Sequence, residues 1–306
     1  MKYFYLLIMA FALSVTSNAQ ITLVKQKKLI GKVKLSTSTT YKAVMRLDKV
    51  QKGQKQAGNS RTKYDTRGNE IEEKRYNGNG GLEWKYATEY DTSGNKIEYR
   101  CYKPNESPSL VFKTNYTYDI NGNRILLVRS DIVNPQYGWK NIYSYDKQGN
   151  KIEFKDISVD GSLNWRNTYK YDAQGNAIEF HRFNGDGSLD SRSTYKYDAK
   201  GNKIESNRFK ADGSFDARYT FKYDMQGNEI EKSSFKADGS LSSKKTYAYD
   251  LQGNKVLYKK YKANGDLRGT ISWEHTLDQQ GNWTKRIKFK NKIAQEITER
   301  TFEYYE

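Results

Sequence analysis

The sequence predicts an all-β protein in which tandem antiparallel hairpins form one long sheet. Three observations predict this fold. Tyr-Asp recurs every 26 to 28 residues along the 306-residue chain. Gly-Asn follows each pair at a fixed offset, so each unit carries the pattern Y-D-x-x-G-N. The residues before each pair alternate between aromatic and polar side chains, which is the period of a β-strand. The tyrosines of these pairs are Tyr64, Tyr90, Tyr118, Tyr145, Tyr171, Tyr197, Tyr223 and Tyr249, and a degenerate ninth copy begins at Leu277.

One unit shows how the pattern forms a hairpin. In "FDARYTFKYD", residues 215–224, Phe215, Tyr219 and Tyr223 fall on one face and the charged residues on the other. The D-x-x-G-N segment suits a turn whose glycine takes a left-handed conformation. The return strand "EIEKSSF" follows, with Ile230 predicted to face inward, and "ADGS" makes the second turn. Nine such units give roughly 18 strands.

Equivalent positions in the units form columns along the predicted sheet. One hairpin cannot bury its own aromatic face, but a stack of hairpins can, because like side chains pack across neighbouring strands. The predicted inward aliphatic column is Ile71, Ile97, Ile125, Ile152, Ile178, Ile204, Ile230 and Val256. A second aromatic column is Tyr76, Tyr102, Phe183, Phe209, Phe235 and Tyr261.

The predicted sheet is too long to stay flat. At about 4.8 Å per strand it would extend roughly 85 Å and expose a very large aromatic face. A round barrel of that circumference would leave a lumen that tyrosine and isoleucine side chains cannot fill. We therefore expect a curled or flattened sheet whose aromatic faces meet.

The ends of the chain differ from the repeats. Residues 1–19 are predicted to be a signal peptide, with a short apolar core and small residues before a cleavage site near Ala19. Residues 20–60 form a predicted N-terminal cap, residues 61–276 the repeat array, and residues 277–306 the degenerate last repeat with a C-terminal cap. We expect export to the periplasm, the cell surface or the medium, with no membrane span in the mature chain.

Charge and composition restrict the partners. The formal net charge of +17 favours an anionic partner, such as an acidic glycan, a lipid head group or nucleic acid. The predicted export makes nucleic acid the least favoured of these. Cys101 is the only cysteine, so no disulfide can form within the chain.

The sequence offers no recognisable catalytic chemistry. The two histidines, His181 and His275, lie far apart and occupy repeat positions. With one cysteine, no Cys/His metal cluster can form, and no glycine-rich phosphate loop precedes a helix. The glutamate columns are read as a salt-bridged, solvated face. We therefore expect no enzyme activity, no metal and no cofactor.

One group of large aromatic residues is a candidate binding site. Six residues before the Tyr-Asp pair, the earlier units carry Trp84, Phe112, Trp139 and Trp165, whereas later units carry small residues. Such rings either fill the core or form platforms for sugar rings, and the sequence leaves both open. Beside them runs a basic column, Arg166, Arg192 and Arg218, which would suit an acidic sugar.

The repeat "YKYDAQGNAIEF", followed by "DGSL", resembles the YD repeat of Rhs-type proteins, especially the short secreted forms of Bacteroidetes-like bacteria. The resemblance covers residues 63–283. It implies an all-β strand stack and a role in cell-surface or carbohydrate binding, and it brings no catalytic residues. In large relatives such repeats form hollow shells around a toxic C-terminal domain, which we do not expect here. We expect a non-catalytic exported protein that binds a glycan or another envelope polymer. The alternative is a structural or protein-interaction module that contacts a surface protein.

Overall fold

A computed structural model of the chain describes residues 29–104, 106 and 109–306. The predicted signal peptide, residues 1–19, lies outside the described residues. The described part contains 21 β-strands and one short 3-10 helix, η1 (Pro135–Tyr137). The strands are β1 (Val33–Arg46), β2 (Lys49–Lys55), β3 (Asn59–Tyr64), β4 (Glu70–Tyr76), β5 (Leu82–Tyr90), β6 (Lys96–Tyr102), β7 (Leu110–Tyr118), β8 (Arg124–Asp131), β9 (Trp139–Tyr145), β10 (Lys151–Ser158), β11 (Leu163–Tyr171), β12 (Ala177–Asn184), β13 (Leu189–Tyr197), β14 (Lys203–Lys210), β15 (Phe215–Tyr223), β16 (Glu229–Lys236), β17 (Leu241–Tyr249), β18 (Lys255–Tyr261), β19 (Leu267–Leu277), β20 (Trp283–Lys290) and β21 (Ile293–Tyr304).

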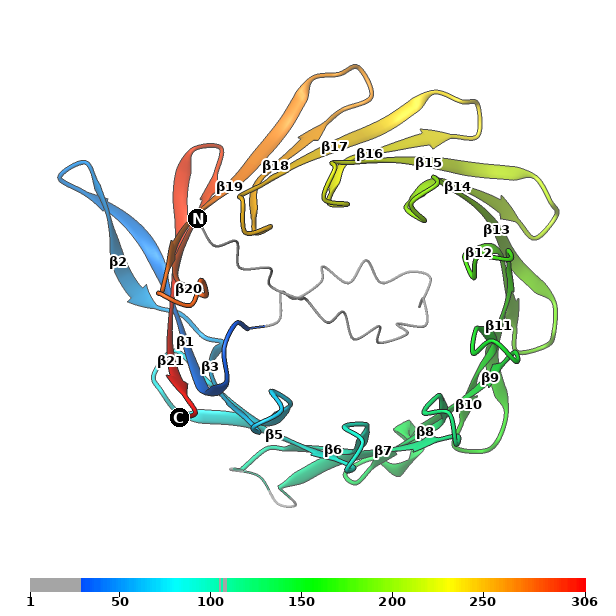
Figure 1. Cartoon of the computed structure of the whole chain (residues 1–306), viewed down its shortest axis with the longest axis horizontal. Helices are drawn as coiled ribbons and strands as arrows, with labels where there is room; N and C mark the ends of the chain where they lie inside the picture. Colours follow the sequence, from blue (N-terminus) through cyan, green and yellow to red (C-terminus); the bar gives the residue numbers. More distant parts are fainter. Residues whose placement is uncertain (1–28, 105, 107–108) are drawn as a thin grey trace, which may run out of the picture.

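The sheet closes on itself. From β3 to β21 each strand pairs antiparallel with the next one in the sequence, and β1 joins the two ends by pairing with β21 and with β3. Twenty strands therefore form a closed barrel, seen as a ring in Figure 1. Among the described strands, β2 alone pairs on one edge only, with the second half of β1. The regions predicted as two separate caps thus contain the strands that meet at this seam.

The prediction of a curled or flattened sheet was wrong. Backbone pairing along the seam removes both free edges, which a curled sheet would leave exposed. Asn282 fastens the seam, because its side chain accepts from the Ile30 nitrogen and donates to the Ile30 carbonyl, both at 2.8 Å. At the other side of β1, the hydroxyl of Tyr305 donates to the carbonyl of Tyr64 at 2.6 Å.

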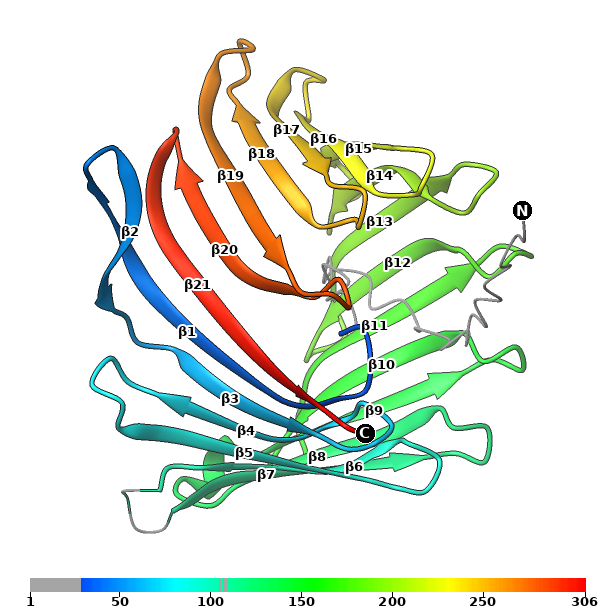
Figure 2. The ribbon, with the colours of Figure 1, turned by 60° about the vertical axis from the view of Figure 1, so that its left-hand side comes forward.

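The two kinds of turn lie at opposite ends of the barrel. Figure 1 shows the Y-D-x-x-G-N turns on the inner side of the ring, whereas the other hairpin ends flare outward, as Figure 2 shows from the side. Nine turns of the first kind repeat one hydrogen bond, from the nitrogen of the aspartate to the carbonyl of the asparagine four residues on. The glycine of each turn has a positive φ, for example +81° at Gly175, which explains why glycine recurs there.

The isoleucine column is not buried as predicted. In β12, Ala177 pairs with Tyr171 and Glu179 pairs with Lys170, so Ile178 is the extra residue of a β-bulge. Its side chain is 38% exposed, and Ile71, Ile97, Ile152 and Ile204 sit in equivalent bulges with similar exposure. The strand parity used for the prediction fails at this bulge.

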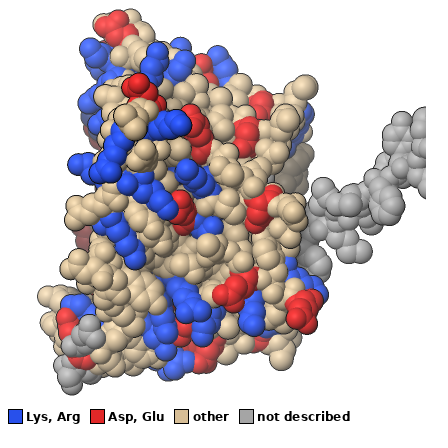
Figure 3. Space-filling view, turned by 90° about the vertical axis from the view of Figure 1, so that its left-hand side faces the viewer, with Lys and Arg blue, Asp and Glu red and all other residues tan. Residues whose placement is uncertain are grey.

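The two faces of the wall carry different side chains. Figure 3 shows lysine and arginine interspersed with aspartate and glutamate on the outside of the barrel. The aromatic residues that share the parity of the Tyr-Asp tyrosines line the inner face. The main core cluster lies on that face and consists of Leu127, Tyr143, Phe154, Tyr169 and Phe180. Because no second layer of the described residues covers them, these rings are buried by neighbours in the same sheet.

Candidate ligand-binding sites

The inner wall carries the predicted aromatic group. Trp84, Phe112, Trp139 and Trp165 lie in β5, β7, β9 and β11, all on the inner face and all half-buried. Trp165 packs on Phe154 with ring centroids 4.7 Å apart, and Phe112 lies 6.0 Å from Tyr99. Trp139 and Trp165 pack against the core cluster. These rings therefore contribute to the core, and each keeps part of its surface exposed.

Cations cover much of this aromatic wall. The Arg129 guanidinium lies 3.7 Å from the centre of the Phe112 ring, and that of Arg182 lies 4.6 Å from the Trp165 ring. Lys151, which is 2% exposed, lies 4.8 Å from the ring of Tyr169. Burial, with repulsion from Arg124, lowers the pKa of Lys151 to about 8. Aliphatic stems and cation–π contacts thus cover the rings that a second sheet would otherwise have to bury.

The predicted arginine column lies on the outer wall. Arg166, Arg192 and Arg218 each lie over the phenylalanine of the following strand, at 4.4, 4.9 and 4.5 Å from its centroid. These phenylalanines are Phe183, Phe209 and Phe235 of the second aromatic column. That column is therefore a platform for cations on the outside of the barrel and is separate from the inner core.

Each outer-wall unit carries two cations and one carboxylate. The carboxylate pairs with the lysine of the preceding strand, as in Lys196–Glu205 at 2.9 Å and Lys222–Glu231 at 2.9 Å. The second cation is the arginine. Its neutralisation by a nearby carboxylate decreases along the column from Arg166 to Arg218. Arg166 lies 3.2 Å from Glu153 and Arg192 lies 3.8 Å from Glu179. Arg218 has no carboxylate within 4.0 Å among the described residues, so its charge is the least compensated of the three.

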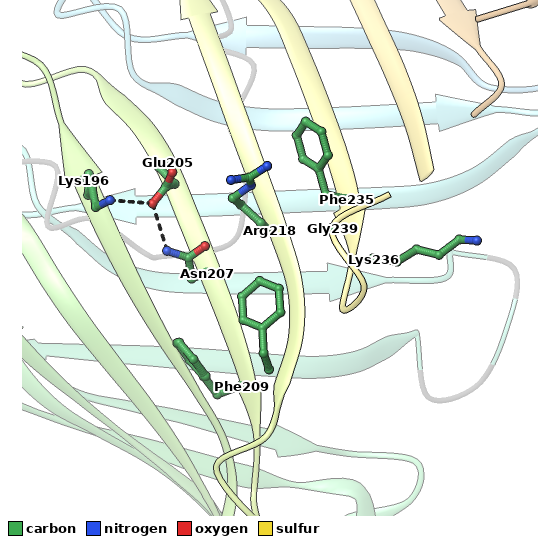
Figure 4. Close-up of a pocket in the computed structure, with 9 residues that line it drawn as sticks. Lys196, Glu205, Asn207, Phe209, Arg218, Phe235, Lys236 and Gly239 are labelled. Carbon is green, nitrogen blue, oxygen red and sulfur yellow. Dashed lines mark hydrogen bonds and ion pairs between the residues drawn. The ribbon is translucent and has the colours of Figure 1, made fainter. Parts of the chain in front are cut away.

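A shallow cleft opens beside Arg218. Its volume is about 390 Å³, and it lies between β13 and the turn after β16. Phe209 and Phe215 pack edge to face there at 5.6 Å. Hydrogen bonds from Lys196 and Asn207 hold the pKa of Glu205 below its usual range (Figure 4). The lining residues are Lys196, Glu205, Asn207, Phe209, Phe215, Arg218, Phe235, Lys236 and Gly239.

The structure separates the seven predicted site residues into two groups on opposite faces of one wall. Trp165 and Arg166 are consecutive in β11 and therefore point to opposite sides. A site that uses both the aromatic group and the arginine column on one face is excluded. The prediction did not include Asn207 and Phe215. The second aromatic column, which holds Phe209 and Phe235, was the signal that could have led to this cleft.

The remaining candidates offer little chemistry. In the described residues, no three His, Cys, Asp or Glu side chains are grouped so that they could hold a metal ion. His181 pairs with Glu179 at 2.9 Å within the outer column. Cys101 is buried, and burial raises the pKa of its thiol to about 11, so it is a poor nucleophile at neutral pH.

Residues 29–306, apart from the undescribed positions, include no helix that is long and apolar enough to span a membrane.

The fold and these surfaces define an all-β, closed barrel of tandem hairpins with an aromatic inner wall and a charged outer wall. No known family model matches the chain, and no curated protein matches it. Among solved structures, the chain resembles a TcdB2-TccC3 complex at 13% identity and a TM-score of 0.38, over 81% of this chain and 16% of that one. It therefore spans about one sixth of the length of that protein.

Two porin-like proteins are also similar. The one from Bacteroides uniformis is 14% identical, with a TM-score of 0.35, over 90% of this chain and 99% of that chain. The one from Bacteroides vulgatus is 11% identical, with a TM-score of 0.31, over 72% of this chain and 94% of that chain. Similarity at this level concerns the fold alone.

Proposed function

We propose that this protein is a non-catalytic, exported binding protein for an acidic glycan or a similar anionic polymer of the cell envelope. The observation that carries the proposal is the placement of Arg218 over Phe235 beside the outer cleft. An uncompensated guanidinium can bind a carboxylate with two hydrogen bonds, while Phe215, which also lines the cleft, offers an apolar face to a sugar ring. Asn207 supplies an amide next to both. These are the groups that a uronic acid would need.

The repeat extends the same chemistry along the wall. Arg192 over Phe209 and Arg166 over Phe183 repeat the arrangement in the two preceding units. Neighbouring units are two strands apart, or about 10 Å. Duplex nucleic acid carries one charge per about 1.7 Å, which is much denser than this series of cations. A sparsely charged polymer therefore fits the outer wall better than nucleic acid does.

A glycan array with residues 20–306 at physiological salt tests this proposal. We expect saturable binding to sugars that carry carboxylates, and loss of that binding in the double variant Arg192→Ala/Arg218→Ala. The double variant Trp139→Ala/Trp165→Ala changes the opposite face and serves as the control, since it should keep the same glycan preference if it folds. Binding that disappears at moderate salt for all anionic sugars alike would contradict a specific glycan site.

One observation favours the alternative of a protein-interaction module. The free edge of β2 offers backbone groups to an extended partner chain. Lys49, Lys52 and Lys55 lie along this strand. Lysine on an edge strand also discourages unwanted pairing, so the edge alone does not identify a partner. If the alternative holds, deletion of the β1–β2 hairpin tip should abolish capture of a surface protein and leave glycan binding unchanged.

A further inference from the structure

The inner wall holds a concentration of unsatisfied polar atoms. Eight buried side-chain nitrogen or oxygen atoms in the described residues have no hydrogen-bond partner. Four of them belong to side chains on the inner face of β8, β9 and β11, namely the Nε atoms of Arg124 and Arg129 and the Oδ1 atoms of Asn141 and Asn167. A buried polar group without a partner destabilises the fold, so these atoms on one part of the wall require an explanation.

Both asparagines occupy equivalent positions in successive units. Each follows a tryptophan by two residues on the same face, Asn141 after Trp139 and Asn167 after Trp165. Asn141 is 9% exposed and Asn167 is 8% exposed. Hydrogen bonding from Asn167 partly offsets the rise that burial causes in the pKa of Tyr169. The amide oxygen of Asn167 nevertheless remains without a donor.

Strand register brings further polar groups to the same place. Asp156 in β10 lies directly opposite Asn141 on one side and opposite Trp165 on the other. Directly opposite residues have Cβ atoms about 5 Å apart, so these three side chains form one row across the wall. Arg129 lies opposite Trp139 in the same way. Asp156 already accepts a hydrogen bond from the Asn164 side chain at 2.7 Å. This part of the wall therefore combines two indole rings, the orphan amide oxygens of Asn141 and Asn167, and an arginine donor.

We infer that this part of the inner wall is a binding site for an uncharged sugar ring, separate from the acidic-glycan cleft on the outer wall. Unpaired amide oxygens require a ligand that donates hydrogen bonds, and Arg129 Nε requires one that accepts them. Each hydroxyl of a pyranose does both. The apolar face of the same ring can stack on the half-buried indole of Trp139, which a fully charged ligand would do less well. Earlier units lack the asparagine, since Thr114 occupies this position in β7, so the site is limited to β8–β12.

The test separates a ligand-binding role of Asn141 from a purely structural role in the core. The two roles predict opposite effects of one substitution on the unfolding temperature. In Asn141→Leu the orphan oxygen is replaced by an apolar side chain of similar volume. If Asn141 serves a ligand, this variant should unfold at a higher temperature, by roughly 2 to 4 °C, and should lose sugar binding. Binding is followed by tryptophan fluorescence during titration with methyl glucoside, methyl galactoside and methyl N-acetylglucosaminide, with adenine as a flat ring that is not a sugar.

A second variant and a control keep the result interpretable. Trp139→Phe retains an aromatic ring in the core, and we expect it to weaken sugar binding at least severalfold while it remains folded. Arg218→Ala on the outer wall should leave this binding unchanged. Unchanged titration of Asn141→Leu, a fall in its unfolding temperature, or a response to adenine alone would each overturn the inference. Loss of acidic-glycan binding on the outer wall would not overturn the inference, because the two sites share no residue.

Discussion

The hydroxyl of Tyr197 donates a hydrogen bond of 2.7 Å to the backbone carbonyl of Ala177, 20 residues earlier. The tyrosine belongs to the Tyr-Asp pair of one unit, and the carbonyl follows the Gly-Asn pair of the unit before it. The same bond recurs around the barrel from Tyr90, Tyr118, Tyr145, Tyr171, Tyr223 and Tyr249. Tyrosine is thus required at this position because its hydroxyl ties each hairpin to the preceding one.

Removal of this hydroxyl should weaken the barrel. We expect Tyr197→Phe to lower the free energy of unfolding by about 1 kcal/mol, because the Ala177 carbonyl loses a buried donor. Chemical denaturation measures the change. Tyr137→Phe is the matched control, since Tyr137 is 65% exposed and lies outside the repeated turns. Equal effects of the two substitutions would contradict a specific role for the tyrosine hydroxyl.

The turn aspartates should make the barrel sensitive to acid. Asp198 accepts hydrogen bonds from the nitrogens of Lys200 and Asn202 and from the Asn202 side chain, and these bonds lower its pKa from the usual 3.8. A carboxylate with a depressed pKa in the folded state stabilises the fold at pH values above its unfolded pKa. That stabilisation is lost as the pH falls through the folded pKa.

We therefore expect the denaturation midpoint to drop steeply below about pH 3.8, because six other turn aspartates show the same lowered pKa. Asp198→Asn should reduce the midpoint at pH 7 and flatten the acid limb. Midpoints that are independent of pH between 2 and 5 would show that these hydrogen bonds do not distinguish the folded carboxylate from the unfolded one.

Lys151 should add a second pH dependence of stability, at alkaline pH. Its folded pKa of about 8 lies below the ordinary lysine value of 10.5. Between these values the unfolded chain binds more protons than the folded chain, so the contribution of Lys151 to stability rises with pH. We expect Lys151→Met to be more stable than the natural chain at pH 7, with the difference shrinking towards pH 10. A constant difference over this range would mean that Lys151 titrates normally in the fold.

The hairpins and their turns could be predicted from the sequence because their signals are local. Alternating residues and a glycine at each turn are enough to place most of the strands. Closure could not be predicted, because it depends on contacts such as Asn282 with Ile30, which join the two ends of the chain. The exposure of Ile178 was missed because a bulge shifts the parity of its strand by one residue.

The site was predictable only in part, for a similar reason. The repeated arginines identified Arg192 and Arg218 as a column. Their partners, Phe209 and Phe235, are on the next strand, and only the strand pairing shows that each lies beside its arginine on the outer face. The separation of Trp165 from Arg166 follows directly from their adjacency in one strand, and it excludes a shared site.

The most direct test of the account is the affinity of the outer cleft for an acidic oligosaccharide, measured by titration calorimetry with oligogalacturonate. Arg218→Ala should weaken binding at least tenfold, or about 1.4 kcal/mol, and Arg218→Lys should restore little, because lysine cannot form the planar double hydrogen bond. Arg46→Ala removes the same charge from an exposed strand end at the tip of the β1–β2 hairpin and should change the affinity little. Equal losses in Arg218→Ala and Arg46→Ala would show that net charge, and no built site, holds the polymer.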